Sequence, residues 1–119
     1  MLGFKRNQVE DAISRVVQPK LQEPSSELRT RIKRLLETER ARGRSVRSSN
    51  PEAAHYAFYS ADARGSGIEV WFSEYEAFAL LVGLRLMAHG WPQGFVVSVL
   101  RRARIGLKEQ HVRILKQDK

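Results

Sequence analysis

Apolar residues recur at helical spacing in two segments of the first third of the chain. Residues 7–17 carry one apolar stripe, with Asn7 as the N-cap and a glutamate three residues later, as in a capping box. Residues 26–41 carry a second stripe, capped by Ser25 or Ser26, with basic and hydroxyl side chains on the opposite side. The connector between them contains two prolines. The pattern therefore predicts two amphipathic helices joined by a connector.

The next segments lack helical periodicity. Residues 42–53 are rich in Arg, Ser, Gly and Pro, which is typical of a mobile basic loop. Residues 54–72 contain an aromatic run, a turn with two glycines, and a run that alternates apolar and other residues. This second segment predicts a β-hairpin.

Helical patterns return in the second half of the chain. Ser73 is a suitable N-cap for residues 74–89, which are apolar on nearly every side and are therefore expected to be buried. Gly90 is placed to end that helix, and a Trp-Pro dipeptide begins the next one. Gly106 is expected to break or bend this helix, and residues 107–117 are expected to form a last short helix.

A chain of 119 residues has room for one hydrophobic core. The predicted fold class is mainly α with one β-hairpin, in the order helix, helix, wing, helix, helix, short helix, which is a winged helix-turn-helix order. Within the single domain 1–119 we expect a helix-turn-helix (7–41), a basic linker (42–53), a hairpin wing (54–72), a helical core (73–104) and a C-terminal helix suited to dimerisation (105–119).

Composition and charge narrow the function. The absence of cysteine excludes disulfides, thiolate zinc sites and cysteine nucleophiles. No apolar run is long enough to span a bilayer, and the N-terminus has no hydrophobic signal core, so we expect a cytoplasmic protein without membrane contact. The net charge of +8 is concentrated in residues 1–50 and 101–119. Such a basic domain is typical of proteins that bind polyanions such as DNA or RNA.

The stretch 72–100, FSEYEAFALLVGLRLMAHGWPQGFVVSVL, resembles the end of the DNA-binding domain of MerR-type transcriptional regulators. The matching positions are Phe72 as the wing aromatic, Ser73 and Glu76 at the helix start, Leu80 and Leu84 in the leucine-rich helix, Gly90 and Trp91 at the break, and 96–100 in the following helix. The resemblance implies a winged helix-turn-helix that binds DNA. The longer connector and linker depart from the family, and without cysteine the resemblance gives no support for metal sensing.

In this interpretation, helix 26–41 enters the major groove and basic side chains neutralise phosphates. The residues expected to reach base edges are Ser26, Arg29, Thr30 and Lys33. The residues expected to contact phosphates are Ser25, Arg34, Arg40, Arg42, Arg44, Arg47 and, at the wing tip, Arg64. For Arg31 and Arg34, intrahelical pairing with Glu27 and Glu37 is an open alternative.

The expected partners are double-stranded DNA and a second copy of the chain. The residues expected to mediate dimerisation are Leu107, His111, Ile114 and Leu115. A protein partner is an alternative, which would make the protein an adaptor or antitoxin-like module with only non-specific DNA affinity. A third possibility is RNA binding through Trp71 and the hairpin tyrosines, although such aromatics more often pack on neighbouring helices. We expect no cofactor, metal or enzymatic activity, because the histidines are scattered and no Walker loop or nucleophile elbow occurs.

Overall fold

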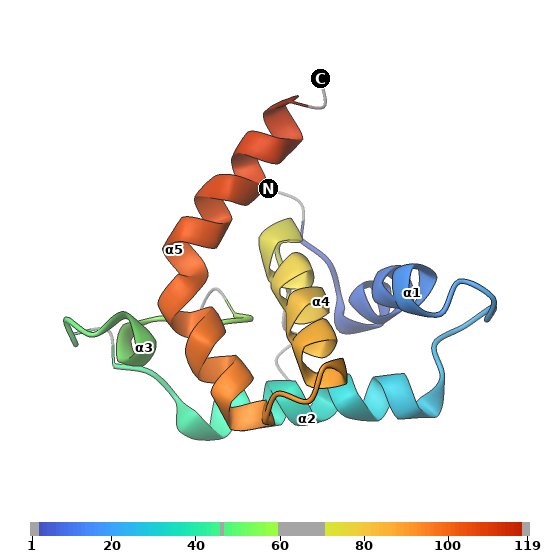
Figure 1. Ribbon diagram of the computed structural model, residues 1–119, viewed down its shortest axis with the longest axis horizontal. Coiled ribbons are helices and arrows are strands. Elements are labelled where there is room, and N and C mark those ends of the chain that lie inside the picture. Colours follow the sequence, from blue (N-terminus) through green and yellow to red (C-terminus); the bar gives the residue numbers. More distant parts are fainter. Residues whose placement is uncertain (1–2, 46, 60–70, 118–119) are drawn as a thin grey trace.

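The computed structural model describes residues 3–45, 47–59 and 71–117. The described helices are α1 (Arg6–Val17), α2 (Ser26–Arg42), α3 (Pro51–Ala54), α4 (Glu74–Ala88) and α5 (Gln93–Gln117) (Figure 1). In Figure 1, α4 lies in the middle, α2 runs beneath it, and α1 and α5 flank it. Helix α4 contacts each of the three helices around it, so it is the centre of the fold. None of the helices in the described ranges is long and apolar enough to cross a membrane.

The apolar stripe of α2 is buried as predicted. Ile32 and Leu35 are completely buried, and Leu28 and Leu36 are nearly so. The Ser25 hydroxyl accepts a hydrogen bond from the Leu28 backbone N–H at 3.1 Å, which confirms a serine N-cap. Burial of this stripe turns the opposite, basic side of α2 outward.

Helix α1 begins earlier than the sequence predicts. Its N-cap is Lys5 and not Asn7, and the Lys5 backbone N–H donates to Gln8 Oε1 at 2.8 Å. Phe4, the residue before this cap, is held in place by an isolated antiparallel bridge with Phe72. Both N–H···O contacts of this bridge measure 2.8 Å. The pairing places the start of α1 against the start of α4, and no local pattern near Phe4 indicates it.

The predicted helix at residues 74–89 is confirmed as α4, one residue shorter at its end. The Ser73 hydroxyl accepts from the Glu76 N–H, and the Glu76 carboxylate accepts from the Ser73 N–H, so the capping box is complete. Gly90 follows the helix with a φ of 96°, a conformation that favours glycine. Both ends of α4 were therefore encoded locally.

The β-hairpin and wing predicted for residues 54–72 are not confirmed. Residues 60–70, with the expected wing tip at Arg64, lie outside the described residues. The flanks that are described form no strand with each other, and Phe72 pairs with Phe4 instead. The predicted linker 42–53 is also not wholly irregular, because Asn50 caps a short helix, α3, that has Pro51 in its first turn.

The expected helix break at Gly106 is wrong. Helix α5 runs without interruption through this position, so the separate short helix 107–117 does not exist. One glycine disfavours a helix by only about 1 kcal/mol, which good helix formers on both sides outweigh. In the first turns of α5, Val96, Val97 and Leu100 are buried while Phe95 is exposed.

Candidate nucleic-acid interface

The outward face of α2 brings together the residues expected to read bases. Ser26, Arg29, Thr30 and Lys33 are all exposed, and so is Arg34. The helix spans 17 residues, about 25 Å, so the face is long enough to lie in a major groove. In Figure 1, α2 forms the lower edge of the molecule, and no other described helix covers it from below. A nucleic acid could approach this face directly.

Acidic side chains accompany the basic ones on α2. Arg31 pairs with Glu27, as the alternative interpretation held, and Lys33 Nζ lies 3.8 Å from Glu37 Oε1. Arg29 Nε lies 3.9 Å from a carboxylate oxygen of Glu10 on α1. Exposed ion pairs of this kind contribute at most about 1 kcal/mol. They would therefore exchange readily for contacts with phosphates or bases.

Three arginines that are expected to contact phosphates make contacts within the protein. Arg42 donates to Ser98 Oγ at 2.7 Å and to the Gly94 carbonyl at 3.2 Å, which ties the end of α2 to the first turns of α5. The guanidinium of Arg40 lies 5.6 Å from the Tyr59 ring centre, and that of Arg44 lies 5.1 Å from the Tyr56 ring centre.

The other predicted phosphate contacts have different surroundings. Arg47 is exposed, and Ser25 is only partly exposed, because its hydroxyl caps α2 and also accepts from Gln18 Nε2 at 3.0 Å. Arg64 lies outside the described residues. Of the predicted phosphate contacts, Arg34, Arg40, Arg42 and Arg47 are exposed, although the Arg42 guanidinium already binds Ser98 and Gly94.

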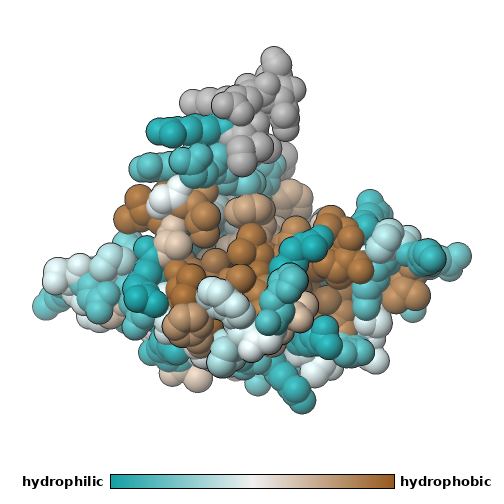
Figure 2. Space-filling view, in the orientation of Figure 1, coloured by the Kyte–Doolittle hydropathy of each residue, from teal (hydrophilic) through white to brown (hydrophobic). Residues whose placement is uncertain are grey.

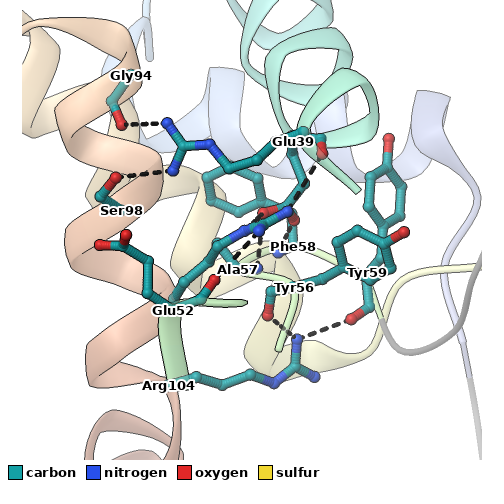
Figure 3. A network of polar contacts seen from close by, with 11 residues as sticks. Glu39, Glu52, Tyr56, Ala57, Phe58, Tyr59, Gly94, Ser98 and Arg104 are labelled. Atoms are coloured by element: carbon teal, nitrogen blue, oxygen red, sulfur yellow. Dashed lines mark hydrogen bonds and ion pairs between the residues drawn. The ribbon is translucent and has the colours of Figure 1, made fainter. Parts of the chain in front are cut away.

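A buried ion pair joins α2 to α5, and the sequence did not predict it. Glu39 and Arg101 are 0% and 1% exposed, and Arg101 Nε lies 3.0 Å from Glu39 Oε2 (Figure 3). The same carboxylate accepts the backbone N–H groups of Ala57 and Phe58, at 2.8 and 2.6 Å. Arg101 also donates to the carbonyls of Glu39 and Glu52. The sequence does contain an indication that Glu39 is buried, because it continues the apolar stripe of α2 three residues after Leu36.

A second ion pair lies close to the first. Arg104 Nη2 contacts Glu76 Oε2 at 2.9 Å. Arg104 Nη1 donates to the carbonyls of Tyr56 and Tyr59 at 2.7 and 2.8 Å (Figure 3). Arg101 and Arg104 are therefore structural residues that anchor residues 52–59 to α5.

The dimerisation face expected on the C-terminal helix is turned partly inward. Leu107 packs against the core, and the His111 ring lies 5.1 Å from the Phe78 ring centre on α4. Ile114 and Leu115 lie in α5, but their side chains are outside the described part of the chain. The exposed apolar residues of this part of α5 are Ile105 (57%) and Val112 (42%), which sequence reasoning did not select.

The aromatic residues divide into buried and exposed groups. Tyr56 and Tyr59 are each 7% exposed, so they pack inside the protein and offer no stacking surface. Trp71 is half exposed, with Lys5 Nζ 5.6 Å from its ring centre. Trp91 and Phe95, at the start of α5, are also exposed and have ring centres 5.3 Å apart.

Burial raises the pKa of two tyrosines. For Tyr59 the main cause is desolvation, partly opposed by Arg40, and for Tyr75 it is again desolvation, partly opposed by Arg104. Both phenols therefore stay protonated at neutral pH. Among the described residues, no three histidine, aspartate or glutamate side chains gather closely enough to hold a metal ion.

Comparisons of the chain with known proteins identify no family. No family model, curated protein or solved structure matches the chain, and the resemblance of residues 72–100 to MerR-type regulators stays a prediction.

Proposed function

We propose that the protein binds double-stranded DNA sequence-specifically through the outward face of α2 and acts as a transcriptional regulator. The observation that carries the proposal is the division of α2 into a buried apolar side and an exposed side with Arg29, Thr30, Lys33 and Arg34. Arg and Lys side chains bind guanine acceptors in the major groove, and hydroxyl groups suit several bases. The net charge of +8 favours approach to DNA.

We propose fewer contacts with DNA than the sequence alone predicts. Arg42 is removed from the proposed contacts, because its guanidinium already holds Ser98 and Gly94. Arg34 and Arg47 stay as phosphate contacts. Arg40 stays as well, at the edge of the face, because its side chain is exposed although it lies over the Tyr59 ring.

The test is a titration of the protein against a random duplex and against genomic fragments, at two salt concentrations. We expect one fragment to bind at least about 10³-fold more tightly than the random duplex, with affinity falling as salt rises. The double variant Arg29→Ala, Lys33→Ala should lose at least tenfold in affinity for that fragment, since each base contact contributes about 1–3 kcal/mol.

The matched control is Arg15→Ala, Arg85→Ala, which removes the same charge from exposed positions on α1 and α4. This control should weaken binding only slightly and leave the preference for the fragment intact. Equal losses in the two double variants would show that α2 reads no sequence and that only the net charge matters.

A protein-interaction module is the second candidate, favoured by the exposed Trp91 and Phe95. Figure 2 shows hydrophobic side chains gathered at the centre of one face of the molecule, over α4 and the first half of α5. Exposed aromatic clusters often mark protein interfaces. This candidate would replace the first if all duplexes bound alike and only at low salt.

A further inference from the structure

A cavity of about 310 Å³ lies between the start of α1 and the second half of α2. Lys5, Arg6 and Asn7 line it from α1, and Glu37 and Arg40 line it from α2. The cavity thus has three cationic side chains against one carboxylate. Its floor is apolar, because the other lining residues include the buried Leu36 and Phe72. A cavity with an excess of positive charge suits an anion.

The N-terminus of α1 adds to this positive potential. The helix begins at the residues that line the cavity, and its first turn contains no acidic residue. Arg6 Nε also lies 3.2 Å from Oε2 of Glu10, a carboxylate outside the cavity lining. An α-helix carries about half a positive charge at its N-terminus, where the first N–H groups lack helical partners. Anions bind readily at such positions.

Tyr59 is an independent observation that points to a ligand. Its side chain is only 7% exposed, and it lines the cavity. Among the described residues its ring contacts Tyr56, Phe72 and Arg40, its carbonyl accepts from Arg104, and its hydroxyl has no hydrogen-bond partner. Unlike the Tyr75 hydroxyl, the Tyr59 hydroxyl is not fully buried, so a ligand in the cavity can reach it. Because burial raises the pKa of Tyr59, this hydroxyl is protonated and can donate to an anion.

We propose that this cavity is an oxyanion-binding site for a phosphate group, in which the Tyr59 hydroxyl and the guanidinium groups of Arg6 and Arg40 donate to the phosphate oxygens. Charge-assisted hydrogen bonds from arginine are the strongest that a side chain offers to phosphate. The phosphate belongs either to a nucleic-acid backbone or to a small phosphorylated molecule. The site does not depend on base reading by α2.

The test is a titration of the full chain with inorganic phosphate, against sodium chloride at matched ionic strength, followed by the amide NMR signals of Arg6 and Asn7. We expect saturable shifts with phosphate and none with chloride. Tyr59→Phe keeps the buried ring and removes only the hydroxyl, and it should weaken phosphate binding about tenfold. Arg40→Gln should weaken it by at least as much, while thermal unfolding confirms that each variant is folded.

The matched control is Arg15→Gln, which removes an exposed cation of α1 that does not line the cavity. Its phosphate affinity should equal that of the wild type. Shifts that grow linearly without saturating, or equal losses in Arg15→Gln and Arg40→Gln, would overturn the site.

Duplex DNA separates the two sources of the phosphate. If the cavity holds a backbone phosphate, Tyr59→Phe weakens duplex binding about tenfold for every sequence, and free phosphate competes with the duplex. If the cavity serves a small ligand, Tyr59→Phe leaves duplex affinity unchanged while phosphate binding is still lost; both results support the site. Saturable phosphate binding by a protein that binds no duplex would overturn the DNA-binding proposal and leave this one standing.

Discussion

At the residue scale, Glu39 determines how residues 52–59 are held. Its carboxylate binds Arg101 and two backbone N–H groups, so every strong interaction it makes lies inside the protein. A buried charge of this kind is tolerated only while its partners are present. The pair therefore makes the fold specific as well as stable, because only this arrangement satisfies both charges.

Arg101→Met should lower the free energy of unfolding by about 3–5 kcal/mol, because Glu39 would remain buried without its counterion. Urea unfolding followed by circular dichroism measures this loss. The double variant Glu39→Leu, Arg101→Met should recover part of it, since no charge is then buried, although the Ala57 and Phe58 amides lose their acceptor. A double variant as unstable as the sum of both single ones would contradict this account.

Tyr75 presents the opposite case. Its hydroxyl is buried, and no residue of the described ranges hydrogen-bonds it. Tyr75→Phe keeps the ring contacts with Phe78 and His111 and removes the unsatisfied group. We expect the free energy of unfolding to rise by about 1 kcal/mol in the same urea assay. A loss of stability would mean that the hydroxyl has a partner in solution.

At the element scale, the sequence predicts what is local. The caps at Ser25 and Ser73, the glycine at 90 and the stripe of α2 each depend on residues within one or two turns, and all are confirmed. The Lys5 cap was missed because its position follows from the pairing of Phe4 with Phe72 across the chain.

The candidate site was predictable only on its outer side. The exposed residues of α2 follow from helical periodicity, since whatever lies opposite the apolar stripe must face outward. The roles of Arg42, Arg101 and Arg104 were not predictable, because their partners lie 28 to 62 residues away in the sequence. Arginine count alone cannot distinguish a phosphate contact from a buried partner.

Gly106 gives a test of α5 as one continuous helix. Gly106→Ala should raise the free energy of unfolding by about 1 kcal/mol, because the added Cβ meets no neighbouring atom within 4 Å. Gly83→Ala is the matched control within α4, where the new Cβ would lie 3.3 Å from both Leu100 Cδ1 and Val96 Cγ1. Gly83→Ala should therefore give no comparable gain. Thermal unfolding of both variants checks the difference, and destabilisation by Gly106→Ala would contradict a regular helix there.

At the scale of the whole molecule, a homodimer would use a different side of α5 from the one expected. Leu107 and His111 are occupied by contacts within the chain, whereas Ile105 and Val112 are exposed one heptad apart. We expect the wild type to sediment as a dimer and the variant Ile105→Glu, Val112→Glu to sediment as a monomer with unchanged circular dichroism. A monomeric wild type would contradict the dimer.

The Glu39–Arg101 pair also bears on how the protein is made. Its two charges are 62 residues apart in the sequence, and α2 leaves the ribosome well before α5 does. Until Arg101 emerges, the nascent chain holds a carboxylate on the apolar side of α2 that has no cation to accompany it into the core. We infer that the core closes only late in synthesis, and that an incomplete chain ending before Arg101 stays open to proteases and chaperones.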